Sequence, residues 1–231
     1  MVAGSSALAA DYSMQRRGAY AQPVFTWTGF YTGMAAGYGW GQQDARSISG
    51  LGYTFTPADL GLTDASAKLD GATVGATLGF NVQFGSVVAG LESDINFADF
   101  KGSRSGLLYG GYGSVGSNVQ WFGTLRGRLG LALDRVLPYV TGGLYWQNSE
   151  GTASYTFAGS TYSLSGSDNR LGWTAGAGVE YALSNEWSVK GEYLYASVNG
   201  NEYTLTYSGV SATIKTDSHS HIARAGLNYR Y

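Results

Sequence analysis

Cysteine is absent from the 231 residues, and proline, charged residues and long apolar runs are scarce. Without cysteine the chain has no disulfide scaffold, no thiolate zinc site and no thiol nucleophile. No stretch approaches the roughly 18 consecutive apolar residues of a membrane helix, which excludes a helical membrane protein. Charged residues make up 13% and the formal net charge is -2, so the basic field that nucleic acid requires is missing.

Glycine and aromatic residues are abundant instead. The 36 glycines are about twice the share of about 7% found in average proteins, and aromatic residues make up 14%. So many apolar rings exclude a disordered chain. Glycine, aromatic residues and low charge together predict many strands, in either an unusual solvent or a crowded interior.

The first residues differ from the rest of the chain. Residues 1–10 end in Ala7-Leu8-Ala9-Ala10 before the polar Asp11, which is typical of the tail of a secretory signal peptide. Residues 11–26 carry charge without a periodic pattern and are expected to form a periplasmic N-terminal arm. The ordered domain is expected to cover 27–231.

Beyond this arm, apolar residues alternate again and again with small or polar ones, which is the pattern of a β-strand. From Ala72 to Val82, for example, every second residue is apolar and its neighbours are glycine, threonine or asparagine. The same test predicts eight strands, near residues 30–40, 71–83, 87–97, 117–131, 138–147, 170–181, 187–196 and 220–231.

Alternation alone allows two arrangements of a barrel: apolar side chains inside a soluble barrel, or outside a barrel embedded in lipid. The positions of the charges favour lipid. The apolar faces of the predicted strands lack Asp, Glu, Lys and Arg, and the opposite faces combine charges with glycines that leave room in a narrow interior. The expected charge network of the lumen is Glu92, Asp94, Arg126, Arg128, Glu180, Lys190, Glu192, Arg224 and Arg230, with Arg170 at the outer rim.

Aromatic residues on the apolar faces gather at both ends of the strands. Rings of Trp and Tyr settle at the two membrane–water boundaries because each has an apolar body and a polar tip. One expected girdle contains Phe30, Phe80, Tyr181, Trp187, Tyr229 and Tyr231, and the other contains Trp40, Trp121, Trp146 and Trp173.

The connections between the predicted strands alternate between short and long. Those at 84–86, 132–137 and 182–186 are short, whereas 41–70, 98–116, 148–169 and 197–219 are long. Short periplasmic turns and long extracellular loops are typical of outer-membrane barrels. The sequence therefore predicts an all-β fold, an eight-stranded antiparallel up-and-down transmembrane β-barrel. A soluble lipocalin-like carrier is the architectural alternative.

Four separated motifs resemble those of a known family. They are Trp27–Gly33 (WTGFYTG), Arg126–Gly130 followed by Leu137–Gly143, Gly172–Glu180 (GWTAGAGVE) and Arg224–Tyr231 (RAGLNYRY). The chain resembles the alphaproteobacterial Omp25/Omp31-like outer-membrane β-barrels, a porin family with an OmpA-like transmembrane barrel. The resemblance implies a Gram-negative cell-surface protein, with both termini in the periplasm, that is porin-like, structural or antigenic.

An eight-stranded barrel has an interior just wide enough to be filled by side chains. Because unpaired buried charges are costly, the near-balanced lumen charges are expected to pair, as Glu92 with Arg126 and Glu180 with Lys190. A structural barrel with a plugged lumen is the favoured function. A narrow pore, gated by re-pairing of these charges, is the alternative, and so is a surface ligand-binding barrel that contacts haem, host molecules or lipopolysaccharide through its loops.

Catalysis is not expected. His219 and His221 lie near Glu202, Asp217, Ser218 and Ser220, but this grouping fits a loop rich in serine and threonine better than a hydrolytic site. The histidines could instead bind a metal or haem iron, although no catalytic residue, cofactor or metal is predicted. The expected partners are outer-membrane lipid and lipopolysaccharide, the barrel-assembly machinery during insertion, and surface partners of the loops 41–70, 98–116, 148–169 and 197–219.

Overall fold

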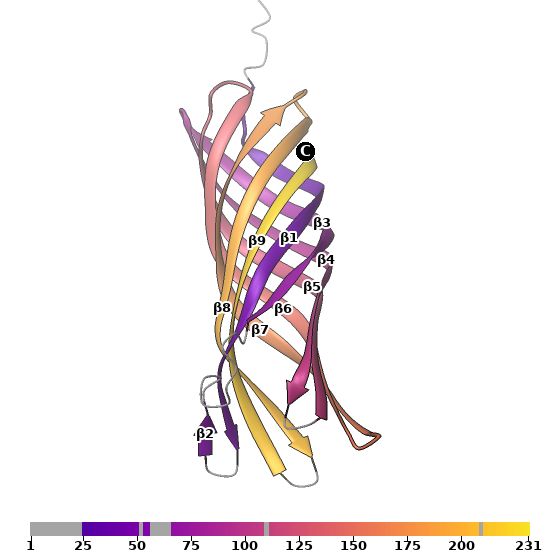
Figure 1. Ribbon diagram of the computed structural model, residues 1–231. Coiled ribbons are helices and arrows are strands. Elements are labelled where there is room, and N and C mark those ends of the chain that lie inside the picture. Colours follow the sequence, from indigo (N-terminus) through magenta and orange to yellow (C-terminus); the bar gives the residue numbers. More distant parts are fainter. Residues whose placement is uncertain (1–24, 51–52, 56–65, 109–110, 208–209) are drawn as a thin grey trace, which may run out of the picture.

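The computed structural model describes residues 25–50, 53–55, 66–108, 111–207 and 210–231. These residues form long β-strands that wind around a common axis (Figure 1). The strands are β1 (Gly29–Gly50), β2 (Tyr53–Phe55), β3 (Ser66–Phe84), β4 (Val87–Leu108), β5 (Gly111–Leu131), β6 (Val136–Phe157), β7 (Ser160–Ala182), β8 (Trp187–Tyr207) and β9 (Val210–Arg230). No helix in the described part of the chain is long and apolar enough to cross a membrane.

Consecutive long strands pair antiparallel, and the last closes on the first. β9 pairs with β1 from Tyr31 opposite Arg230 to Gly50 opposite Ala212. The short β2 pairs only with the far end of β1. The result is a closed barrel of 8 antiparallel strands, as predicted. Closure satisfies the backbone groups of the long strands, which lipid could not do.

The strands are longer than the sequence pattern predicted. β6 and β7 continue their pairing as far as Phe157 opposite Ser160, so most of 148–169 is strand and not loop. Most of 98–116 and 197–219 is likewise strand. The predicted ends were too early because threonine, serine and tyrosine maintain the ladder beyond the apolar segment.

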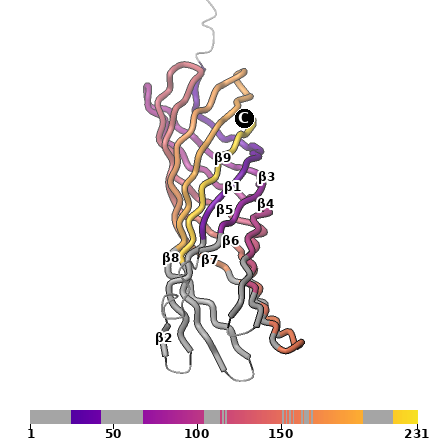
Figure 2. Tube along the Cα trace, in the orientation of Figure 1, coloured from indigo at the N-terminus to yellow at the C-terminus, as the bar shows by residue number. Residues whose placement is uncertain are grey.

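The two ends of the barrel differ. The short turns at 85–86, 132–135 and 183–186 and the C-terminus lie at one end, called here the turn end (Figures 1 and 2). The paired strand extensions lie at the other, the hairpin end. Residues 1–24, which include the expected signal remnant and nearly all of the expected arm, lie outside the described residues.

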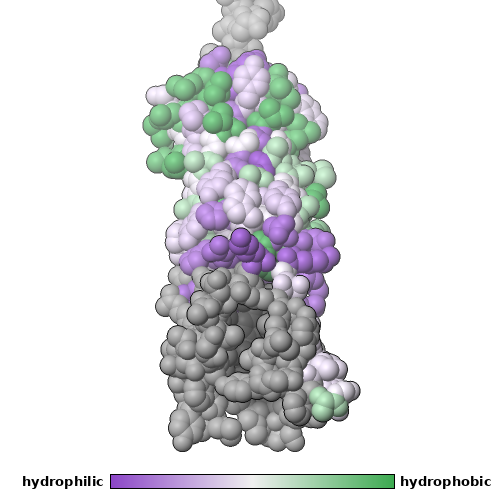
Figure 3. Space-filling view, viewed as in Figure 1, coloured by the Kyte–Doolittle hydropathy of each residue, from purple (hydrophilic) through white to green (hydrophobic). Residues whose placement is uncertain are grey.

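Apolar side chains cover the outside of the barrel and charged ones lie within. Leu78 and Leu91 are 62% and 64% exposed, whereas Arg126 is 0% exposed. The surface is hydrophobic toward the turn end and becomes hydrophilic farther along (Figure 3). A soluble carrier would have the opposite arrangement, so that alternative is wrong. An outer wall of apolar side chains with such large exposed fractions is typical of a barrel that is surrounded by lipid.

The predicted girdle aromatics lie at both ends of the outer wall. At the turn end, Phe30 packs on Phe80 with ring centroids 4.5 Å apart, and Tyr229 contacts both Trp187 and Tyr231. The exposed side chains of this set also include Tyr181, and those toward the hairpin end include Trp40 and Trp173. Trp121 and Trp146 are half-buried. The Trp146 indole lies over Gly123, where a Cβ would come within 2.5 Å of it.

Candidate functional site

The barrel interior holds a network of ionised side chains, called here the charged network. Four are acidic and four are basic, so their formal charges cancel, and each is at most 5% exposed. They project from β4, β5, β7, β8 and β9, at positions of the inward-facing parity. Its members are Glu92, Asp94, Arg126, Arg128, Glu180, Lys190, Glu192 and Arg224.

Arg126 is the centre of this network. Its Nη2 donates to Glu92 and to Asp94 Oδ2, the latter at 2.8 Å, and its Nη1 lies 3.0 Å from Glu192 Oε1. Its Nε donates to Thr124 Oγ1 at 2.9 Å. The predicted pair of Glu92 with Arg126 is therefore confirmed. Three carboxylates on two strands share one guanidinium, whose planar fork suits such multiple contacts.

Two further cations complete the bonding of these carboxylates. Arg224 donates from Nε to Glu192 Oε2 at 2.7 Å and from Nη2 to Asp94 Oδ2 at 2.9 Å. Lys190 donates to Glu92 Oε2 at 2.8 Å. All three acids therefore contact at least two cations, and side chains from β4, β5, β8 and β9 meet across the lumen.

The predicted ion pair of Glu180 with Lys190 is wrong. The two residues are opposite each other in the β7–β8 register, but Glu180 binds the Nη2 of Arg128. Cross-strand pairing fixes neighbours along the wall, whereas these long side chains reach inward across the narrow lumen. The Arg128 guanidinium also stacks on the Tyr139 ring, 3.6 Å from its centroid.

Neutral side chains donate further hydrogen bonds to the carboxylates of the network. Tyr31 donates its hydroxyl to Glu92 at 2.7 Å, and Tyr139 donates to Glu192 at 3.0 Å. Glu180 accepts from Ser188 at 2.5 Å and from Asn228 at 2.9 Å. These neutral residues were not predicted as part of the lumen network, although their inward parity could have identified them.

An apolar cluster closes the turn end of the lumen. This inner seal consists of Trp27, Val88, Leu137 and Ala182, all 0% exposed. Trp27 is held by hydrogen bonds from its backbone nitrogen to Gln83 Oε1 and from its indole Nε1 to the carbonyl of Asp134. Arg230, expected in the network, instead covers the Trp27 ring at 4.8 Å and donates to the carbonyl of Thr26.

A second apolar cluster closes the lumen on the hairpin side of the network. The sequence pattern did not predict this outer apolar layer. Most of its members lie on the strand faces that were interpreted as polar, where they alternate with outward-facing residues. A signal was present, since Phe122, Leu194 and Ile222 share the parity of Arg126, Glu192 and Arg224 on the same strands. The layer consists of Phe100, Val119, Phe122, Tyr145, Leu194, Ala196, Val198 and Ile222. Arg170, expected at the rim, is buried.

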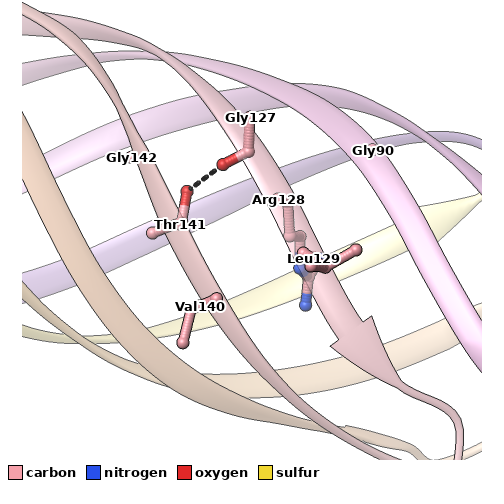
Figure 4. Close-up of a pocket in the computed structure, with 7 residues that line it drawn as sticks. All are labelled: Gly90, Gly127, Arg128, Leu129, Val140, Thr141 and Gly142. Atoms are coloured by element: carbon pink, nitrogen blue, oxygen red, sulfur yellow. Dashed lines mark hydrogen bonds between the residues drawn. The ribbon is translucent and has the colours of Figure 1, made fainter.

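A shallow hollow of about 350 Å³ lies in the barrel wall on β5 and β6 and is lined by residues including Arg128. It forms where Gly127 pairs with Gly142, because both outward positions lack a side chain between Leu129 and Val140 (Figure 4). Thr141 fastens the two strands by donating to the carbonyl of Gly127 at 2.8 Å. The hollow therefore lies in the wall over β5 and β6, and its lining also includes Gly90 of β4.

Among the described residues, the hydrogen-bond partners of His219 and His221 are hydroxyls on β8, from Tyr193, Tyr195 and Ser197. His219 and His221 lie on the outward parity of β9, whereas Asp217 and Ser218 are buried. The side chain of Glu202 lies outside the described residues. Within the described ranges, no group of three or more His, Cys, Asp or Glu side chains could hold a metal ion.

Comparison with known proteins agrees with this architecture. Residues 5–230 match the family model of the outer membrane protein beta-barrel domain. The 31 kDa outer-membrane immunogenic protein of Brucella melitensis is 34% identical, over 98% of this chain and 94% of its own length. The 25 kDa outer-membrane immunogenic protein of Brucella canis is 30% identical, over 90% and 81% respectively.

Among solved structures, the outer membrane protease OmpT from Escherichia coli is similar with a TM-score of 0.53. The match covers 88% of this chain and 97% of that one at 9% sequence identity, a likeness of fold alone. The relatives, the family model and the barrel agree with the resemblance of the four motifs. The chain belongs to the outer-membrane β-barrel family that includes the 31 kDa and 25 kDa immunogenic proteins of Brucella.

Proposed function

We propose that this chain is a closed structural barrel of the outer membrane, without a conducting pore, that presents its extended hairpins as a contact surface. The observation that carries the proposal is the filled lumen. The charged network occupies the middle of the barrel, with the inner seal on one side and the outer apolar layer on the other. A dry apolar layer at each end removes the water that a moving ion needs.

The same contacts argue against the gated pore. Re-pairing would require Arg126 to leave Glu92, Asp94 or Glu192, and each vacated carboxylate would remain buried. Loss of one partner from a buried ion pair typically costs about 3–5 kcal/mol. Thermal motion would therefore populate such an open state rarely.

Planar-bilayer recording tests the closed barrel. The purified full chain, Arg126→Ala and Leu125→Ala should all be silent, because both apolar layers persist in each. Leu125 is the matched control, since it adjoins Arg126 in sequence but lies on the outer wall. Unitary conductance in the unsubstituted chain that changes in Arg126→Ala and not in Leu125→Ala would establish the pore instead.

The proposed orientation places the turn end, with both termini, in the periplasm and the hairpin end outside the cell. Outer-membrane barrels have short periplasmic turns, and the short turns lie at the turn end. Because the chain has no cysteine, single cysteines give a clean test in intact cells. A membrane-impermeant maleimide should label Ser160→Cys at a hairpin tip and spare Asn185→Cys in a turn, and the reverse result would invert the orientation.

Lipid around the apolar wall and the barrel-assembly machinery during insertion are the proposed partners. No reaction is proposed. The buried carboxylates Glu92, Asp94, Glu180 and Glu192 are each bound by cations, so none is available as a general base.

A further inference from the structure

Two imidazoles and three large rings form a cluster on the outer wall toward the hairpin end, where β1, β8 and β9 are adjacent. His221 stacks on Trp40 with centroids 5.9 Å apart and planes 17° apart. His219 stacks on Tyr195 at 6.1 Å and 15°. These residues, together with Tyr193, form the aromatic–histidine patch. Its rings present flat faces and polar edges at one level of the barrel.

The hydrogen bonds of the patch use one nitrogen of each imidazole. The hydroxyl of Tyr193 lies 2.6 Å from Nδ1 of His221, and that of Tyr195 lies 2.9 Å from Nδ1 of His219. Ser197 Oγ is a second neighbour of Nδ1 of His219, at 3.3 Å. Neither Nε2 has a hydrogen-bond partner among the described residues. Both rings are therefore oriented by the protein, and each keeps a polar edge for an external group.

The patch lies where the apolar wall ends. Toward the turn end, the next outward residues on β9 are Ala223 and Ala225, and both are exposed. Across β1 and β3, the same level is polar: His219 is in register with Gln42 and then Lys68. Figure 3 shows the corresponding change from a hydrophobic to a hydrophilic surface.

The exposed charged side chains near the patch compensate one another, so the net charge of the patch depends on the two imidazoles. His221 is in register with Trp40, then Asp70 on β3 and Lys101 on β4. Asp70 accepts a hydrogen bond from Tyr38, and Lys101 forms an exposed salt bridge with Asp99 at 2.7 Å. Lys68 and Lys101 balance Asp70 and Asp99. On β8 the patch faces the neutral hydroxyls of Tyr193, Tyr195 and Ser197, and on β9 the carboxylate of Asp217, two residues before His219, is buried. Protonated imidazoles would therefore make this surface cationic.

We infer that the aromatic–histidine patch binds the phosphorylated sugar headgroup of an outer-leaflet glycolipid. Indole and phenol rings fit the apolar face of a sugar, and an imidazolium Nε2–H forms a charge-assisted hydrogen bond to phosphate. Because protonation gives each imidazole a positive charge, binding should strengthen with acidity. This inference rests on the proposed orientation, because the hairpin end must face the outer leaflet.

The two histidines, the only ones in the chain, give a direct readout. The full chain in detergent micelles is titrated with diphosphorylated lipid A, and the imidazole Cε1–Hε1 signals are followed by NMR. Both signals should shift with the phosphorylated probe, more at pH 5.5 than at pH 7.5. Shifts of equal size with the phosphate-free lipid would overturn the phosphate contact.

Calorimetric titration of variants measures the contribution of the patch. The double variant His219→Gln and His221→Gln should bind about tenfold more weakly at pH 5.5, as expected for loss of charged hydrogen bonds. Tyr229→Gln, a substitution in the turn-end girdle, is the matched control and should change affinity less than about twofold. Unchanged affinity in the double variant would refute the site. The conductance of the barrel is measured in a separate experiment. A failure of the closed-barrel proposal can therefore be distinguished from a failure of this binding site.

Discussion

Lys190 lies directly opposite Glu180 in the β7–β8 register, yet its ammonium group binds Glu92 on β4, 2.8 Å away. The contact crosses the lumen and links β8 to a strand that is not its neighbour in the wall. Backbone pairing alone would leave the barrel free to flatten. Ion pairs across its diameter fix its cross-section, which is a structural role for the charged network.

Removing this lysine should destabilise the barrel strongly. Lys190→Met leaves Glu92 with less compensation in a buried site, and loss of a buried partner typically costs about 3–5 kcal/mol. Urea unfolding in micelles, followed by the heat-modifiable shift on gels, measures the cost. Lys101→Met, which breaks an exposed pair, should cost about 1 kcal/mol or less. Equal losses in the two variants would contradict a buried, shared network.

Trp27 should contribute to stability although it precedes the first strand. Trp27→Ala removes a fully buried ring and should cost about 3–5 kcal/mol. Trp187→Ala on the exposed wall should cost less, because that indole is only half in contact with protein. The urea midpoints of the two variants provide the comparison. A larger loss of stability in Trp187→Ala than in Trp27→Ala would mean that Trp27 does not pack inside the barrel.

Two glycines on adjacent strands should differ in how well the barrel folds when a methyl group is added to each. A Cβ at Gly143 would lie 2.1 Å from the carbonyl oxygen of Leu125, so Gly143→Ala should fold poorly. A Cβ at Gly127, in the hollow of Figure 4, meets nothing closer than a backbone oxygen at 3.8 Å, so Gly127→Ala should fold normally. The folded fraction on unheated gels distinguishes them, and equal fractions would contradict the strand packing.

A charge on the outer wall should be costly in proportion to its depth. Leu125→Lys places an ammonium in the apolar wall and should cost about 2–4 kcal/mol, as at a bilayer midplane. Leu183→Lys, at an exposed position in a turn, should cost about 1 kcal/mol or less. Unfolding from lipid vesicles measures both. If Leu125→Lys were neutral, this face could not be in contact with lipid.

The architecture was predictable from period-two alternation because one face of each strand is uniformly apolar. The ends of the strands were not, because β6 and β7 continue beyond the apolar segment to Phe157 and Ser160 through residues that are mostly small or polar. The inward charges followed from parity, but most of their partners did not. Parity assigns Glu180 to the lumen without saying whether Lys190 or Arg128 reaches it, because that choice depends on the curvature of the whole wall.

The contact of Thr26 with Arg230 joins residues 204 positions apart in the chain. Alongside it, the backbone nitrogen of Tyr231 donates to the carbonyl of Phe30 at 3.0 Å. Both contacts need β1 and β9 to be in place at once, so a growing chain cannot form either until β9 has been made. The join between these two strands thus distinguishes a closed barrel from an open sheet that lacks β9.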